Sequence, residues 1–379
     1  MLAYDKGQVI VPTGGGKTLT MILDTQRRHN VINNGTTTVV VAPRILLAEQ
    51  LCSEFMEIVD TAHTHVMHVH SGETHYFSTT KSEKIALFNN VARTAGENVI
   101  IFTTYHSLHR VVDADIEVNT IYFDEAHNSV QRHFFPATEF FAENADRCYF
   151  YTATPKHSLT PKKPGMNWSV YGQVIANVPA PELVEQGYIL PPKVVIKKLD
   201  IIKGRKVMYA EDSDNLLETI DDNKIDKTLI CARTTKQIVG LISQSDFCVQ
   251  LYRRGYSWMT ITSKTGAIID GKKVDREEFF NTLNTWGKDP SKKFVCIHHS
   301  ILSEGINVKG LEAVIFMRNM DYIGISQSIG RVIRLGAESK TFGLVCVPTY
   351  DSVGISTARK VQAVVDVVFN QGQPAISEI

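Results

Sequence analysis

The residues best suited to chemistry near the start of the chain form a glycine-rich turn, Pro12-Thr-Gly-Gly-Gly-Lys-Thr18. An apolar run over residues 9–11 predicts the end of a buried strand before it, and helical spacing begins after the turn. Backbone amides in such a turn, with the N-terminus of the following helix, can surround an anion. Lys17 would reach the outer phosphates of a nucleotide, and the Thr18 hydroxyl would ligate Mg²⁺. The stretch meets the end of the pattern G-x-x-x-x-G-K-S/T, although Val11 stands where its first glycine belongs.

Two adjacent acids, Asp124 and Glu125, follow an apolar strand expected over residues 120–123. In a nucleotide site Asp124 would hold Mg²⁺ through water, and Glu125 would orient and deprotonate the attacking water. Acids at a strand end are also frequently only solvated, so the pair alone leaves both interpretations open. Together with the upstream turn that holds Lys17, the pair favours a nucleotide site.

The composition is that of a soluble globular protein, with 379 residues, 43% of them hydrophobic, and a formal net charge of zero. This length is sufficient for two domains with separate cores. The zero net charge argues against a protein that coats nucleic acid, but it is compatible with a local groove that grips a backbone.

The apolar runs are too short to cross a bilayer, and Asp5 and Lys6 interrupt any signal region, so we expect no membrane partner. A cytoplasmic location follows, in the host cell if the protein is viral. The six scattered cysteines include no C-x-x-C pair and are expected to be reduced thiols.

Strands that end in small polar residues must position the candidate site. They are expected over residues 38–43, 98–104, 120–123 and 149–152, and helical patterns separate them. This alternation predicts a parallel sheet with crossover helices, and ligands bind at the carboxyl edge of such sheets.

A stretch rich in proline and glycine, residues 161–192, marks the expected domain junction. A second α/β series follows it. Its expected strands cover residues 228–232, 293–298, 310–317 and 341–347, with helices over 234–243 and 356–370.

The segment 63–70 contains four histidines, a composition that invites a zinc interpretation. His63 and His65 are expected on the opposite face of a strand from His68 and His70, because side chains alternate. No carboxylate or cysteine completes a site, so solvated or hydrogen-bonded histidines are favoured.

The glycine-rich turn and Asp124-Glu-Ala-His127 resemble motifs I and II of superfamily 2 helicases of the DEAH type, in the style of compact phage and restriction helicases. Further motifs follow in the family's order. Residues 42–50 resemble motif Ia, 103–108 motif Ib, 152–155 motif III, 229–233 motif IV, 303–307 motif V and 327–334 motif VI. The resemblance covers nearly the whole chain, and motifs I, II and VI together are its most specific part.

The resemblance implies an α/β fold of two RecA-like domains, each a parallel sheet with crossover helices, and an ATP site with Mg²⁺ in the interdomain cleft. We expect residues 1–178 to form the ATP-binding domain and residues 179–193 a linker. Residues 194–379 would then form the C-terminal domain with its terminal helix.

The resemblance also implies roles for individual residues. The expected catalytic residues are Lys17, Asp124, Glu125, Gln327, Arg331 and Arg334. The expected nucleotide-binding residues are Thr13, Gly14, Gly15, Gly16, Lys17, Thr18, Gly305 and Asn307, with Thr18 and Asp124 at the metal. Arg331 and Arg334 would stabilise charge on the γ-phosphate, and Gln327 would pair with His127 to report the nucleotide state.

A nucleic-acid strand would lie across both domains and would be held by its backbone rather than its sequence. Arg44, Thr103, Thr104 and Ser303 are expected to contact its phosphates. Thr152 and Thr154, with His127, would link these contacts to the nucleotide.

Two features depart from the family pattern. Asn307 replaces the acid that usually ends motif V and bonds the ribose. The residues before Pro12 hold no candidate for the glutamine-containing motif that reads adenine, so we expect ATP and GTP to be hydrolysed with similar efficiency.

The favoured function is an ATP-dependent nucleic-acid helicase or translocase, a nucleic-acid-stimulated ATPase that acts on DNA or RNA, with DNA favoured. One alternative is the motor part of a restriction or repair nuclease, although no acid-rich nuclease cluster follows Arg334. A second is an ATP-gated nucleic-acid clamp that does not translocate. The polarity of movement and the oligomeric state stay open, and a monomer is compatible.

Overall fold

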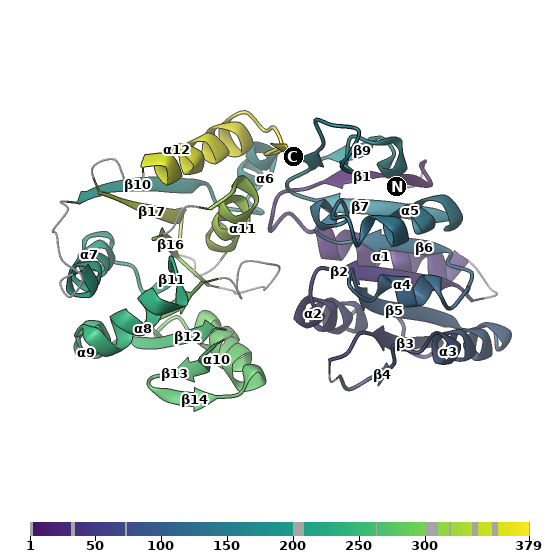
Figure 1. Ribbon diagram of the computed structural model, residues 1–379, viewed down its shortest axis with the longest axis horizontal. Helices are drawn as coiled ribbons and strands as arrows, with labels where there is room; N and C mark the ends of the chain where they lie inside the picture. The colour runs from purple at the N-terminus through teal and green to yellow at the C-terminus, as the bar shows by residue number, and fades with distance from the viewer. Residues whose placement is uncertain are drawn as a thin grey trace. The chain divides into compact units, whose positions relative to one another are not determined.

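The computed structural model describes residues 3–31, 35–72, 74–199, 208–262, 264–299, 310–317, 320–335, 340–350 and 355–378. The chain divides into two compact units, Met1–Pro179 with Pro374–Ile379, and Ala180–Gln373 (Figure 1). Most of the expected linker over residues 179–193 therefore belongs to the second unit in this structure. The end of the chain, expected in the C-terminal domain, returns to the first unit.

The first unit contains a large sheet and the helices that cover it. Its strands are β1 (Lys6–Ile10), β2 (Thr37–Ala42), β3 (Thr64–Val69), β4 (Phe77–Ser78), β5 (Asn98–Thr104), β6 (Thr120–Phe123), β7 (Arg147–Thr152), β8 (Lys156–His157), β9 (Val174–Asn177) and β18 (Ser377–Glu378). Its helices are α1 (Lys17–Val31), α2 (Ile45–Met56), α3 (Ser82–Thr94), α4 (Leu108–Val112) and α5 (Phe135–Asn144), with the short 3₁₀ turns η1 (Ala126–Asn128) and η2 (Ser169–Tyr171).

The large sheet of the first unit has the order β4-β3-β5-β2-β6-β7-β1-β9, and all its strand pairs are parallel. Strand β7 lies between β1, which leads into the glycine-rich turn, and β6, which leads into the two acids. The candidate residues that follow these strands therefore meet at one edge of the sheet.

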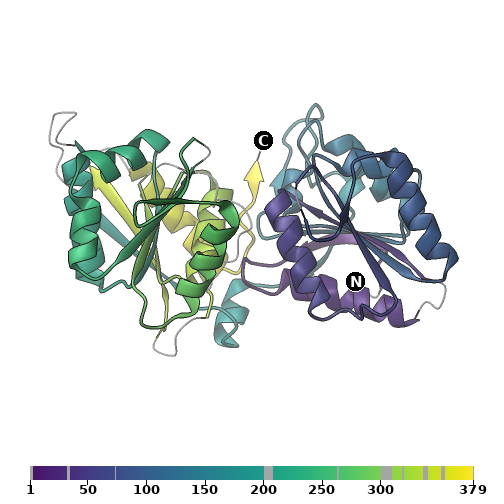
Figure 2. The same cartoon turned by 90° about the horizontal axis from the view of Figure 1, so that it is seen from below.

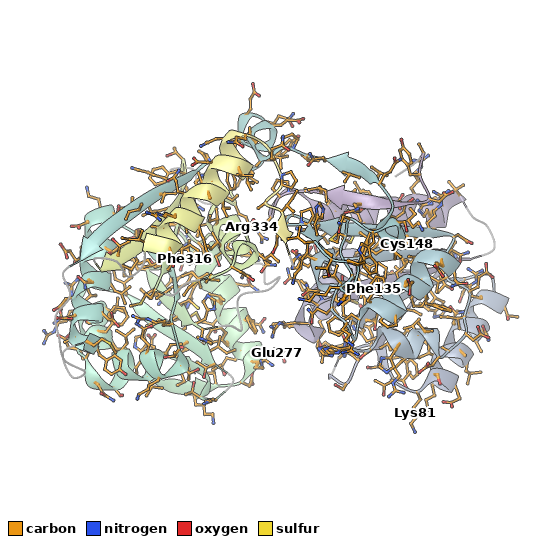
Figure 3. The ribbon with its side chains drawn as sticks, turned by 45° about the horizontal axis from the view of Figure 1, so that its top comes forward. Lys81, Phe135, Cys148, Glu277, Phe316 and Arg334 are labelled. Atoms are coloured by element: carbon orange, nitrogen blue, oxygen red, sulfur yellow. The ribbon has the colours of Figure 1, made fainter. Side chains whose placement is uncertain are left out.

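The core of the first unit lies on both faces of this sheet, because successive side chains of a strand point to opposite faces. Val39 and Val41 pack into one cluster with α3, α4 and α5. Val40 and Ala42 pack into the other with α1 and α2. In Figure 3, Phe135 and Cys148 mark the first of these clusters. Continuous apolar strands are thus explained by burial on two sides.

The second unit repeats the plan with a second large sheet. Its strands are β10 (Pro192–Leu199), β11 (Lys227–Cys231), β12 (Ser257–Thr262), β13 (Gly266–Ile269), β14 (Lys272–Val274), β15 (Phe294–His298), β16 (Ala313–Phe316) and β17 (Gly343–Tyr350). Its helices are α6 (Ala180–Glu185), α7 (Met208–Asn223), α8 (Thr235–Gln244), α9 (Phe247–Arg253), α10 (Arg276–Lys288), α11 (Tyr322–Val332) and α12 (Ile355–Val364), which continues into the π-helical turn η3 (Val365–Asn370).

The sheet of the second unit has the order β10-β17-β16-β11-β15-β12-β13-β14. The pairs from β10 to β12 are parallel, and β13 and β14 extend the edge as an antiparallel hairpin. Asp270 and Gly271 form the two-residue hairpin turn, and both have a positive φ, which suits the twist of the joined strands. Helices flank each of the two large sheets (Figure 2).

The end of the chain forms a small parallel pair with the first unit. Ser377 of β18 pairs with Lys156 of β8, and the Ser377 amide donates to the Pro155 carbonyl at 3.0 Å. Among the helices that the structure describes, none combines the length and the hydropathy needed to cross a bilayer.

Candidate active site

The glycine-rich turn connects the buried strand β1 to the first residue of α1, Lys17. Gly14 and Gly16 both have φ of 87°, a conformation that residues with a Cβ atom rarely adopt. The Gly15 amide donates to the Pro12 carbonyl at 2.9 Å and closes the turn. The positive end of the α1 dipole and its first amides therefore follow directly on a turn that only glycines can make, as an anion site requires.

The two acids follow β6, and both are almost completely buried. The Asp124 amide donates to the Val41 carbonyl at 2.9 Å, which ties the turn to the neighbouring strand β2. Lys17 Nζ lies 3.4 Å from Glu125 Oε1, and His127 Nδ1 lies 3.6 Å from Glu125 Oε2. The fold thus brings the predicted phosphate-binding lysine to the predicted catalytic base.

The electrostatics of this pair of acids favour a cation. Burial, followed by the charge of the adjacent Glu125, raises the pKa of Asp124 to about 7, and Lys17 opposes the shift. A buried carboxyl group in this state gains from a positive charge that shares its site. The proposed donor set, the Asp124 carboxylate and the hydroxyl of Thr18 directly after Lys17, is of the hard-oxygen type that Mg²⁺ prefers.

The turn also contains a hydrogen-bonding group that the described residues leave unused. Thr13 Oγ1 is buried and has no hydrogen-bond partner among them. Buried hydroxyl groups are nearly always paired, so this atom is one that a ligand could satisfy. The glycine turn, the lysine and this hydroxyl together fit the phosphates of a nucleotide.

Motif III lies against motif II at the end of β7. His127 Nδ1 lies 3.0 Å from Thr152 Oγ1 and 3.5 Å from Thr154 Oγ1, and the Thr154 amide donates to Thr152 Oγ1 at 3.1 Å. The Val11 amide, just before the glycine-rich turn, donates to the Thr152 carbonyl at 3.0 Å. The structure therefore brings together His127, Thr152 and Thr154, which the sequence assigned to communication between sites.

The residues expected at nucleic acid differ in their exposure. Arg44 is exposed and precedes the first turn of α2. Thr103 and Thr104 are buried, and Thr103 Oγ1 donates to the Val69 carbonyl at 2.9 Å. The structure does not bring these two threonines to the surface, because they complete the buried strand β5. Ser303 lies outside the described residues.

In the second unit, Gln327 and Arg331 lie on α11 and Arg334 follows its end. The spacing of four residues places Gln327 and Arg331 on one face of the helix. Asp321 caps this helix by accepting from the Gly324 amide at 2.8 Å. Gly305 and Asn307, expected at the nucleotide, lie outside the described residues.

Gln327 and Arg331 are buried, whereas Arg334 is half-buried. Burial raises the pKa of the Cys296 thiol on β15, and the charge of Arg331 opposes this shift. The Arg334 backbone is bridged to Ile189, and its carbonyl accepts from Lys340 Nζ at 2.9 Å. Figure 3 labels Arg334 in this unit.

Three residues that support the acids were not predicted as site residues. Tyr105 Oη donates to the Asp124 carbonyl at 2.8 Å, Asn128 Nδ2 to the Glu125 carbonyl at 3.0 Å, and Ser129 Oγ to the Ala126 carbonyl at 2.6 Å. The Asn-Ser pair directly after motif II is a signal for a side-chain-stabilised turn. No comparable signal in the sequence points to Tyr105.

The four histidines of segment 63–70 do not form a metal site in the part of the chain that the structure describes, where no group of three metal-ligating side chains occurs. His68 Nδ1 lies 2.9 Å from His70 Nε2, and both rings are buried. The Gly72 amide donates to His70 Nδ1, so His70 donates from Nε2 to His68. His65 pairs instead with Glu97.

The two α/β units, each a large sheet with flanking helices, are RecA-like domains. Residues 3–157 match the family described as "Type III restriction enzyme, res subunit". No curated protein sequence matches the chain significantly.

Three solved structures illustrate the range of similar folds. The ATP-dependent Type ISP restriction-modification enzyme LlaBIII bound to DNA has a TM-score of 0.70 and 17% identity over 100% of this chain and 30% of that chain. An HsdR fragment from Vibrio vulnificus YJ016 has a TM-score of 0.62 and 14% identity, over 99% of this chain and 64% of that chain. S. cerevisiae Dbp5 bound to RNA and ADP BeF3 has a TM-score of 0.59 and 16% identity, over 99% and 85%. The chain thus spans about 30% of the length of the Type ISP enzyme.

Proposed function

We propose that this chain is the core of a DEAH-type helicase or translocase that hydrolyses ATP to move on or unwind nucleic acid. The observation that carries the proposal is the approach of Lys17 to Glu125 beside Asp124, at the carboxyl edge of a RecA-like sheet. A lysine at the start of a helix after a glycine turn, beside two buried acids, has the parts needed for phosphoryl transfer to water.

In the proposed reaction, the Gly14–Thr18 turn and Lys17 bind the phosphates of ATP. Thr18 and Asp124 would hold Mg²⁺, which would neutralise charge on the phosphate oxygens. A water oxygen attacks the γ-phosphorus while the bond to the β–γ bridging oxygen breaks. Glu125 orients this water and accepts its proton, since its carboxylate is buried beside the phosphate-binding lysine.

The second unit would supply the remaining groups. By resemblance, Arg331 and Arg334 stabilise charge on the γ-phosphate, and Gln327 responds to the nucleotide together with His127. Gly305 and Asn307 would contribute to nucleotide binding. These roles require the two units to close during turnover, so a partner that favours closure should raise the rate.

The proposed partner is a nucleic-acid strand, with DNA favoured over RNA. Support comes from the restriction family matched by residues 3–157 and from the Type ISP neighbour, which is bound to DNA. The neighbour Dbp5 is bound to RNA, so the fold is compatible with either. Arg44 and Ser303 are proposed to contact the backbone, with Thr103 and Thr104 shaping the adjoining segment from within the sheet.

The test is steady-state ATP hydrolysis by the chain alone and with single-stranded DNA, duplex DNA or single-stranded RNA. Turnover should rise severalfold or more with at least one of them, and Glu125→Gln should abolish the basal and the stimulated signal. If none of these nucleic acids changes the turnover, the proposed motor function is rejected. A strand-displacement assay on the stimulating substrate then separates unwinding from translocation alone.

A second candidate, the motor part of a restriction or repair nuclease, is favoured by the same family match and by the HsdR neighbour. It predicts ATP-dependent movement along duplex DNA, measured by displacement of a bound triplex-forming strand. An ATP-gated clamp predicts ATP-dependent retention on DNA without displacement. The same assay distinguishes these two.

A further inference from the structure

The turn that carries the proposed catalytic base has an unfavourable backbone conformation. Glu125 has φ of 47° and ψ of 52°, in the left-handed region that a residue with a Cβ atom rarely occupies. Such a residue persists only where its surroundings hold it. The position of the Glu125 carboxylate therefore depends on the groups that fix the backbone around it.

Three side chains fix the backbone of this turn by donating hydrogen bonds to three successive carbonyls, those of Asp124, Glu125 and Ala126. Asn128 donates to the Glu125 carbonyl and Ser129 to the Ala126 carbonyl, and both residues belong to the same turn. The first carbonyl is bonded by Tyr105 Oη at 2.8 Å, from the end of a different strand, β5. Tyr105 is thus the support in this group that connects the turn to another element.

Tyr105 also connects to the segment that resembles motif Ia. Its amide donates to the Ala42 carbonyl at 3.1 Å, two residues before the exposed Arg44. The next residue along the chain, His106, is exposed, and its ring meets Phe134 edge-on at 4.7 Å. One buried residue therefore lies between the surface segments expected at nucleic acid and the backbone of motif II.

The contact lies in the core of the first unit. The Tyr105 ring is 2% exposed and packs against Phe123 and Phe134, with ring centroids 6.1 Å and 5.6 Å away. The hydroxyl must be the donor in the bond to Asp124, because a carbonyl oxygen can only accept. Displacement of the segment around Tyr105 must then displace the Asp124 carbonyl or break its hydrogen bond.

We propose that Tyr105 is a positioning residue that couples nucleic-acid binding to the Asp124–Glu125 turn. A nucleic-acid strand bound against the Arg44 and His106 segments would act through the Tyr105 hydroxyl and draw the turn into the arrangement that suits hydrolysis. The inference rests on the proposed function, because it concerns stimulation of the same ATPase site.

The test is Tyr105→Phe, which removes one oxygen and keeps the packed ring. We measure kcat and KM for ATP with and without the stimulating nucleic acid, and compare the ratio of stimulated to basal kcat. The ratio of stimulated to basal kcat should fall severalfold towards one, because one buried hydrogen bond that forms the link is lost. KM for ATP should change little, since the bond that is removed ends on the Asp124 backbone and not on the Gly14–Thr18 turn proposed to bind the phosphates.

The matched control is Tyr256→Phe in the second unit. Tyr256 is also buried and donates its hydroxyl to a backbone carbonyl, that of Ile225, at 2.6 Å. The ratio of stimulated to basal kcat in Tyr256→Phe should stay at the wild-type value. If Tyr105→Phe lowers basal and stimulated turnover equally, the hydroxyl is only a structural support and the coupling is overturned.

The outcome for the wild type separates this inference from the proposed function. A wild-type ratio of one rejects the proposed function and the coupling together. A wild-type ratio well above one that Tyr105→Phe retains rejects the coupling alone.

Hydrogen exchange of the wild type provides a test should Tyr105→Phe not fold. Saturating nucleic acid should slow the exchange of amides in residues 124–129 at least threefold, since the turn becomes more firmly held. Unchanged exchange in this peptide, with protection at residues 42–44, would show that binding does not reach the turn.

Discussion

Lys17 Nζ and Glu125 Oε1 lie 3.4 Å apart, and the two side chains are only 10% and 7% exposed. Lys17 begins α1, which follows β1, and Glu125 lies in the turn after β6. Strand β7 lies between β1 and β6 in the sheet. The proposed phosphate-binding cation and the proposed base therefore form a buried ion pair. A nucleotide that binds Lys17 through its phosphates would take over this charge and release Glu125 to act on water.

Replacement of the proposed base should separate binding from hydrolysis. Glu125→Gln keeps the size of the side chain but removes the proton acceptor, so kcat should fall about 10²- to 10⁴-fold. Binding of a fluorescent ATP analogue and of nucleic acid should persist. Turnover near that of the wild type would remove Glu125 from the reaction.

Replacement of the lysine should act on binding itself. Lys17→Ala removes the charged donor to the phosphates and should raise Kd for ATP at least about tenfold, as for a lost hydrogen bond to a charged group. Titration with a fluorescent analogue measures it. Lys84→Ala, at an exposed position of α3, is the control and should bind as the wild type does. Equal affinities for all three proteins would contradict the assignment.

The two arginines of motif VI should differ in their effect on stability. Arg334→Ala should lower kcat about 10³-fold, the scale of an arginine finger, with a small change in Tm. Arg331 is 3% exposed, so Arg331→Ala should lower Tm further as well as kcat. Thermal unfolding and ATPase assays on both variants check this. Near-normal turnover of Arg334→Ala would leave Arg331 as the finger.

Stability should fall in mild acid because of the buried histidine pair. Burial, with a smaller effect from His70, lowers the pKa of His68 to about 4. Between pH 6.5 and 4 the unfolded chain binds a proton that folded His68 does not, so the free energy of unfolding falls as the pH falls. Urea unfolding at pH 7.5 and 5 measures this difference, which should be smaller in His68→Gln. The exposed His63→Gln should keep the wild-type difference. An identical pH dependence in His68→Gln would exclude this histidine as a source.

The sequence alone was sufficient to predict the two α/β series and the residues at the ends of their strands. These features are local: a strand buried on two faces is a continuous apolar run, and a turn with positive φ needs glycine. The predicted fold of two RecA-like domains is confirmed. The roles of the site residues stay predictions.

Only the tertiary structure decided which of these local features meet. The order that puts β7 between β1 and β6, the Lys17–Glu125 pair, and the Tyr105 bond to Asp124 all join residues far apart in the chain. So does the return of β18 to β8. Hydrophobic periodicity determines which face of a strand is buried but not which strand lies beside it, because pairing order follows from the packing of crossover helices over the whole domain. Tyr105 could not be distinguished in the sequence from any other core tyrosine, since its proposed role depends on a carbonyl that the fold brings to it.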